Sequence, residues 1–215
     1  MANDVSISVF NKTANRDLFI TIFQKPQTAN PNVIYTSLFP VAWEVLALGP
    51  NQTADPVVYP VQLQLQVTEH NSAINAIRRK TLQDVDEGQV WSFKRPGVFS
   101  ELTQSGKAKG VDGVVVCQNN STEFIDVGIA KNGSMLTVQE DLAEGEQADF
   151  QLTPKLYFLA LSNLQKGDII RSDQVTQGAF EVDLTNLQSI DVTVTTSNVA
   201  SGKLAWATSN AVAAS

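Results

Sequence analysis

The run Val61-Gln62-Leu63-Gln64-Leu65-Gln66-Val67 alternates apolar residues and glutamines without a break. In extended backbone, successive side chains point to opposite faces, so this pattern predicts a strand with one buried face. The same alternation recurs in residues 5–9, 18–22 and 190–194, where β-branched and aromatic residues dominate. Segments rich in Asn, Ser, Thr and Gly separate these runs and are typical of turns. We therefore expect an all-β fold.

The composition excludes several classes of protein. The chain has 215 residues, of which 43% are hydrophobic, enough for one large domain or two small ones. It carries 15 basic and 22 acidic residues, and the net charge of −7 argues against binding to nucleic acid or to an anionic membrane. One cysteine and one histidine exclude an internal disulfide and a zinc site built from cysteines and histidines. We expect no cofactor.

The amino-terminal residues lack the cationic and apolar regions of a secretory signal. The longest purely apolar run, residues 156–161, is far shorter than the roughly 20 residues that span a bilayer. We expect a cytoplasmic protein without a membrane span, for which export by a non-classical route stays open. Sequon-like triplets are expected to reflect composition rather than glycosylation, and they begin at Asn11, Asn51, Asn119, Asn120 and Asn132.

The two halves of the chain share a pattern. Residues 7–22 align with residues 114–129 at an offset of 107, and residues 40–48 align with residues 154–162 at an offset of 114. An internal repeat of this kind predicts two similar structural units. We expect two tandem antiparallel β-sandwich units, 1–106 and 107–215, packed together about a pseudo-twofold axis.

Four segments together resemble a known family. In the first half, Leu18-Phe19-Ile20-Thr21-Ile22-Phe23-Gln24-Lys25-Pro26 is followed by Pro40-Val41-Ala42-Trp43-Glu44-Val45. The second half contains Val127-Gly128-Ile129-Ala130-Lys131-Asn132-Gly133-Ser134 and then Thr153-Pro154-Lys155-Leu156-Tyr157. These segments resemble the Rhi-type, rhizosphere-expressed proteins of plant-associated bacteria. The resemblance implies an all-β protein made under cell-density control, and it supplies no catalytic residue.

Catalysis through the single thiol would require Cys117 as a thiolate beside His70 as a base. Cys117 continues the apolar run Val114-Val115-Val116, so we interpret it as a small buried side chain. His70 lies in a polar segment and is most simply a solvated residue. We therefore predict no catalytic residue.

Two acidic segments could hold a hard cation. Asp84, Asp86 and Glu87 precede a glycine and form a fragment of the ligand set that calcium prefers. A longer acidic segment covers residues 140–146. The alternative is that both are solvated turns, or that their charges prevent association of strand edges.

Aromatic side chains are the remaining sequence feature that could indicate a ligand-binding site. Trp91 and Trp206 lie on alternating strands near the end of each half, where a flat ring could bind a sugar or another ligand. Trp43 and Tyr157 lie on strands that are apolar on both faces, so we expect them in the core.

The favoured hypothesis is a non-enzymatic β-sandwich protein that acts through protein interaction or self-assembly. Neutral strands with glutamine-rich faces offer edges to a partner or to a second copy of the chain. The alternative is a lectin-like module that binds a glycan or another small ligand, and an enzyme with an unrecognised site comes third.

Overall fold

The computed structural model describes residues 4–28, 30–71, 76–107, 113–172, 178–198 and 202–214. The expected all-β fold is confirmed, because the only helix in these residues is a 3₁₀ turn at Pro31–Val33. No helix there is long and apolar enough to cross a membrane. The strands are β1 (Val5–Asn11), β2 (Leu18–Phe23), β3 (Leu38–Pro40), β4 (Glu44–Leu48), β5 (Val57–Tyr59), β6 (Leu63–Asn71), β7 (Ala76–Val85), β8 (Gln89–Lys94), β9 (Glu101–Lys107), β10 (Val114–Asn119), β11 (Ile125–Lys131), β12 (Ser134–Leu142), β13 (Gln147–Gln151), β14 (Lys155–Ala160), β15 (Phe180–Asp183), β16 (Leu187–Asn198) and β17 (Lys203–Ala213).

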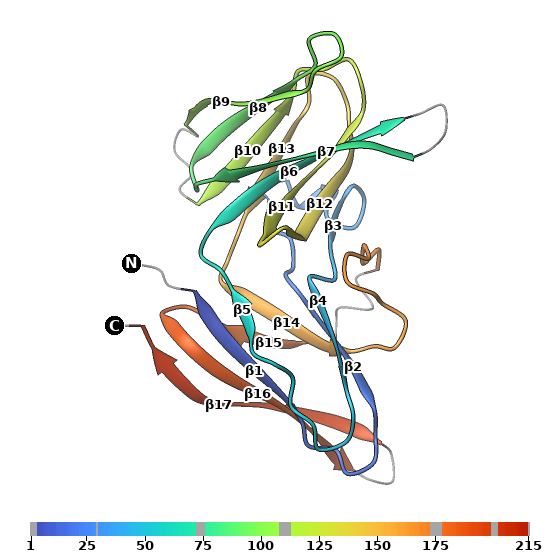
Figure 1. Cartoon of the computed structure of the whole chain (residues 1–215), viewed down its shortest axis with the longest axis vertical. Helices are drawn as coiled ribbons and strands as arrows, with labels where there is room; N and C mark the ends of the chain where they lie inside the picture. Colours follow the sequence, from blue (N-terminus) through green and yellow to red (C-terminus); the bar gives the residue numbers. More distant parts are fainter. Residues whose placement is uncertain are drawn as a thin grey trace.

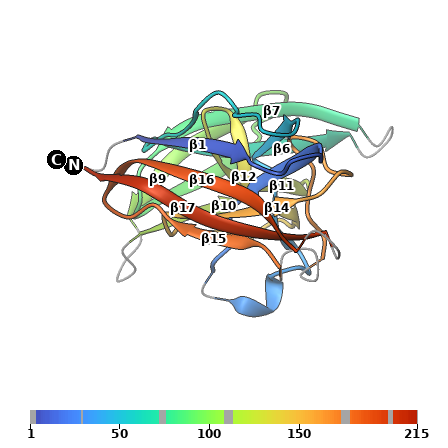
Figure 2. The same cartoon turned by 90° about the horizontal axis from the view of Figure 1, so that it is seen from below.

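These strands form four sheets that pack in pairs. The lower sandwich in Figure 1 combines the sheet β17-β16-β1-β5 with the sheet β15-β14-β2-β4. The upper sandwich combines the sheet β13-β10-β8-β9 with the sheet β3-β12-β11-β6-β7. Figure 2 shows the lower sandwich from below, with β17 and β16 running across the molecule next to β1.

Each half of the chain contributes strands to both sandwiches. The first strands, β1, β2, β4 and β5, share their two sheets with the last four, β14 to β17, whereas β3 and β6 to β13 form the upper sandwich. The expected tandem arrangement is therefore not confirmed, and the repeat boundary at residues 106 and 107 stays a prediction. The main chain enters the upper sandwich briefly at β3, and it crosses between the sandwiches again from β5 to β6 and from β13 to β14.

The sheet pairings repeat in part at the expected offset of 107. β1 lies between the parallel strand β16 and the antiparallel strand β5. In the same way, β10 lies between the parallel strand β8 and the antiparallel strand β13. The offset of 114 is wrong, because it equates β4 with β14, and these two strands lie on either side of β2 in one sheet. Both segments are apolar and contain a proline, at Pro40 and Pro154, and this similarity does not require equivalent positions in the fold.

The alternating pattern decides which side chains enter the core. Ile7 and Val9 on β1, and Leu65 and Val67 on β6, are fully buried, as the sequence predicts. One continuous cluster of buried apolar side chains includes residues of both sandwiches, and Trp43 is one of its largest members. The two sandwiches therefore share a core, and burial of this apolar surface is the main force that holds them together.

A buried asparagine ends the first strand of each half. The Oδ1 atom of Asn11 accepts hydrogen bonds from the backbone N–H and the hydroxyl of Thr13, at 3.0 and 2.7 Å. Asn119 accepts the same two bonds from Ser121 at the same distances. Both asparagines are fully buried, so these two sequon-like triplets form turns between strands.

Candidate functional site

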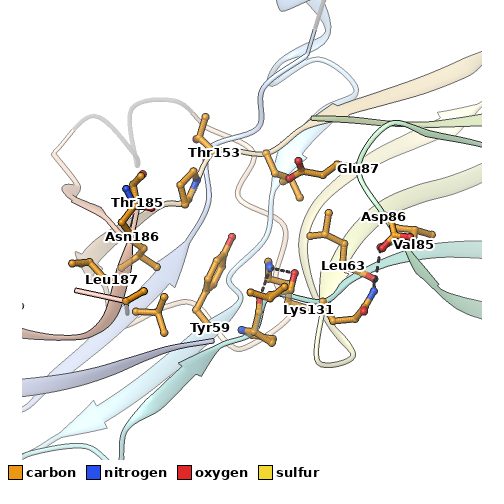
Figure 3. Close-up of a pocket in the computed structure, with 18 residues that line it drawn as sticks. Tyr59, Leu63, Val85, Asp86, Glu87, Lys131, Thr153, Thr185, Asn186 and Leu187 are labelled. Carbon is orange, nitrogen blue, oxygen red and sulfur yellow. Dashed lines mark hydrogen bonds between the residues drawn. The ribbon is translucent and has the colours of Figure 1, made fainter. Parts of the chain in front are cut away.

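A cavity of about 560 Å³ lies between the two sandwiches, where the chain crosses from one to the other. Its walls come from the β5–β6 and β13–β14 connections and from the turns after β7 and β15 (Figure 3). This volume falls within the range of roughly 300–1,000 Å³ that is usual for small-molecule sites. Most of the wall is apolar and consists of Val5, Pro60, Val61, Leu63, Val85, Leu152, Pro154, Leu184, Leu187 and Ala214.

Lys131 is the cation of this cavity. Its side chain is only 4% exposed, and Nζ donates hydrogen bonds to the carbonyl oxygens of Pro60 and Val61, the latter at 3.0 Å. Nζ also lies 4.3 Å from the centre of the Tyr59 ring, within the range of a cation–π contact. Burial lowers the pKa of Lys131 to about 8, because water no longer stabilises the ammonium.

Tyr59, at the start of the β5–β6 connection, is linked through Gln24 to the β13–β14 connection. Its hydroxyl donates to Oε1 of Gln24 at 3.4 Å, and the Gln24 amide donates in turn to the carbonyl oxygen of Thr153. Figure 3 shows the hydroxyl pointing toward Thr153 across the cavity. Trp43 packs edge-on against the Tyr59 ring at 5.6 Å between ring centres. Burial raises the pKa of Tyr59 above its usual value, so the hydroxyl stays protonated and can donate.

Carboxylates outnumber the single ammonium around the cavity. Asp86 and Glu87 lie on the turn after β7 and line the wall. Asp4 accepts a hydrogen bond from the backbone N–H of Val61 at 2.8 Å. Asp4 and Glu87 are close enough to oppose the effect of burial on the pKa of Lys131. Because Asp4, Asp86 and Glu87 face the single ammonium of Lys131, the formal net charge around the cavity is negative.

The position of Lys131 predicts a specific pH dependence of stability. Its pKa is about 8 in the folded protein and about 10.5 in the unfolded chain. Between these values the unfolded state binds a proton that the folded state has lost, so stability rises with pH. We expect the wild type to gain about 2 kcal/mol from pH 8 to pH 10 relative to Lys131→Met in urea unfolding. Parallel pH profiles of the two proteins would contradict this account of Lys131.

Of the residues predicted to bind calcium, Asp84 lies near the end of β7, and Asp86 and Glu87 lie on the turn that follows. Asp84 accepts a hydrogen bond from Gln64, and Asp86 accepts one from Gln89, both at 3.0 Å. Asp86 and Glu87 both line the cavity (Figure 3). In the described part of the chain, no group of three or more His, Cys, Asp or Glu side chains is placed to hold a metal ion. The calcium site stays a prediction.

The two tryptophans predicted to bind a ligand have different surroundings. Trp91 is 7% exposed, and its indole N–H donates to Gln89 at 3.0 Å. Trp206 is half-buried and stacks on Phe180 at 6.0 Å between ring centres. Neither residue lines the cavity. Their role in binding stays a prediction.

The thiol of Cys117 is fully buried in the core, as the sequence predicts. Burial also raises its pKa to about 12, so the thiolate needed for nucleophilic attack does not form near neutral pH. His70 belongs to β6, and its side chain lies outside the described part of the structure.

These features define an all-β protein of two β-sandwiches with a partly enclosed cavity between them. A family model supports the resemblance drawn from the sequence. The chain belongs to the RhiA family, whose model matches residues 2–202. No curated protein matches the chain.

Proposed function

We propose that this protein acts by binding, and that the cavity between the sandwiches holds a small ligand. The observation that carries the proposal is the combination of a cavity of about 560 Å³ with an apolar wall and a few polar groups. Pockets of this kind are typical of sites that bind an apolar ligand body and orient it through one or two polar contacts.

The charges of the cavity favour a cationic ligand. The Lys131 ammonium is already bound by the Pro60 and Val61 carbonyl oxygens. The Glu87 carboxylate lines the cavity, and among the described residues it forms no hydrogen bond and no ion pair, although its charge acts on Lys131. A ligand with an apolar chain and one amine would therefore place the amine at Glu87 and the chain along Leu63 and Leu187.

Octylamine and octanoate test this proposal, since they share a chain length and differ in charge. We expect octylamine to bind at least tenfold more tightly than octanoate in isothermal titration calorimetry. Glu87→Gln should remove this preference, whereas Glu101→Gln on β9 should keep it. Ala214→Trp should fill the cavity and abolish binding, whereas Ala213→Trp, one residue away and outside the wall, should not.

Three results would reject the proposal. Octanoate could bind as tightly as octylamine, neither probe could bind at millimolar concentration, or Ala214→Trp could leave binding unchanged. The first would refute the preference for a cation, and the other two would refute the cavity as the site.

The sequence also suggests that the protein acts through protein interaction or self-assembly. This is a separate proposal, because it concerns the exposed strand edges and not the cavity. A glycan ligand on Trp91 or Trp206 is the remaining alternative, although the burial of Trp91 does not favour it. Cytoplasmic location stays a prediction.

A further inference from the structure

The strand β17 forms a free edge of the lower sandwich. It comprises the 11 residues Lys203–Ala213, and hydrogen-bonded pairing is found on one side only, with β16 (Figure 2). Its residues from Ala207 to Ala213 are exposed. The strand contains a single charged residue, Lys203, and no proline. Long, neutral edges of this kind readily pair with another strand.

The other sheet edges carry the features that prevent such pairing. The edge strand β7 bears four charged residues, and β9 is charged at both ends. The edge strands β3 and β5 have three residues each, and β4, β13 and β15 have at most five. Short length and charge are the usual protection of edges, so β17 is the exception among the described edges.

The backbone groups that point to the free edge can be identified. The Val194 carbonyl on β16 accepts a hydrogen bond from the Lys12 N–H on the side of β1. Backbone groups alternate in direction along a strand, so Thr193 and Thr195 point to β17, where they pair with Ala207 and Ala205. The residues between them, Leu204, Trp206 and Thr208, therefore direct their N–H and C=O groups to the free edge.

We propose that β17 pairs with β17 of a second copy of this chain, antiparallel and about a twofold axis at Trp206. Trp206 of one copy then exchanges backbone hydrogen bonds with Trp206 of the other copy. Leu204 of each copy exchanges them with Thr208 of the other. A twofold arrangement presents the same surface from both partners and closes after two copies. The pairing joins two four-stranded sheets into one continuous sheet of eight strands.

The charges near β17 are complementary in this register. Lys203 of one copy lies opposite Ser209 of the other, and Ser209 pairs with Asp191 on β16. Neighbouring strands lie about 4.8 Å apart, so the Lys203 side chain can cross one strand and reach the carboxylate of Asp191. Asn210 donates to the same carboxylate at 2.7 Å and holds it on that face. The twofold axis creates this ion pair twice.

Analytical ultracentrifugation over a range of concentrations tests the dimer. We expect the wild type to dimerise at micromolar concentration and Lys203→Glu to weaken the dimer at least tenfold. Adding Asp191→Lys to Lys203→Glu should restore the affinity, because the swapped charges attract in this register. Lys107→Glu on the edge strand β9 is the matched control and should leave the dimer unchanged.

Thr208→Pro provides a second test, because proline removes an N–H that points to the free edge and leaves the pairs with β16 intact. We expect it to abolish the dimer without unfolding the protein, as judged by circular dichroism. A wild type that stays monomeric at 100 µM concentration, a dimer that survives Thr208→Pro, or a charge swap that fails to restore affinity would overturn the proposal. Ligand binding in the cavity does not depend on any of these results.

Discussion

Asn11→Ala is expected to lower the free energy of unfolding by about 3 to 5 kcal/mol, because several buried polar groups lose their partners at once. The Asn11 amide donates to the carbonyl oxygens of Arg16, Leu48 and Gly49, at 2.8, 3.1 and 2.9 Å. Its Oδ1 atom accepts the two bonds from Thr13. Alanine can make none of these bonds, and water cannot replace them at a fully buried position.

Urea unfolding measures this loss, with Asn15→Ala as the control. Asn15 has the same side chain in the same loop but is exposed, so its replacement should change stability by less than about 0.5 kcal/mol. Asn119→Ala should cost about as much as Asn11→Ala, since Asn119 donates to Glu123 and Leu142 carbonyls and accepts from Ser121. A loss below about 1 kcal/mol in both variants would show that these hydrogen bonds contribute little.

Gly128→Ala is expected to destabilise the protein by more than about 3 kcal/mol, because the added methyl group has no space. A Cβ atom at Gly128 would clash with the Thr137 carbonyl oxygen and would lie 2.9 Å from Sδ of Met135. The Met135 side chain can move, but the backbone of β12 cannot do so without breaking its pairing with β11. Because β11 lies in the middle of its sheet, the disturbance would reach β6 as well.

Thermal unfolding should separate this effect from the general cost of replacing a glycine in a strand. Gly106→Ala on β9 is the matched control, because a Cβ atom at that position meets no other atom within 4 Å. There alanine should be neutral or should stabilise the fold by up to about 1 kcal/mol. Equal melting temperatures for the two variants would contradict the argument from close packing at Gly128.

The fold class could be predicted because burial follows the period of the strands. Val5, Ile7 and Val9 are buried on β1, and Ile190, Val192 and Val194 are buried on the adjacent strand β16. The alternation does not show which strands pair, since any two half-buried strands have the same pattern. That is why the sequence predicted tandem units although β1 pairs with β16.

The cavity could not be predicted in this way. Tyr59 and Lys131 are far apart in the sequence, and each is the last residue of its strand, as an ordinary boundary residue is. Only the tertiary fold brings Nζ of Lys131 over the ring. The available signals were Pro60 and Pro154, which interrupt the strand pattern where the chain crosses between the sandwiches. Of the predicted residues, only Asp86 and Glu87 reach the cavity wall.

The exchange of strands between the halves has a consequence for synthesis on the ribosome. β1 is made well before its parallel neighbour β16, because most of the other strands lie between them in the sequence. The lower sandwich therefore cannot close until β14 to β17 have been made, whereas β6 to β13 can fold earlier as a contiguous segment. Pairing between such distant segments is intrinsically slow, so β1 and β2 each wait with one edge unpaired, and these edges are exposed to aggregation during that time.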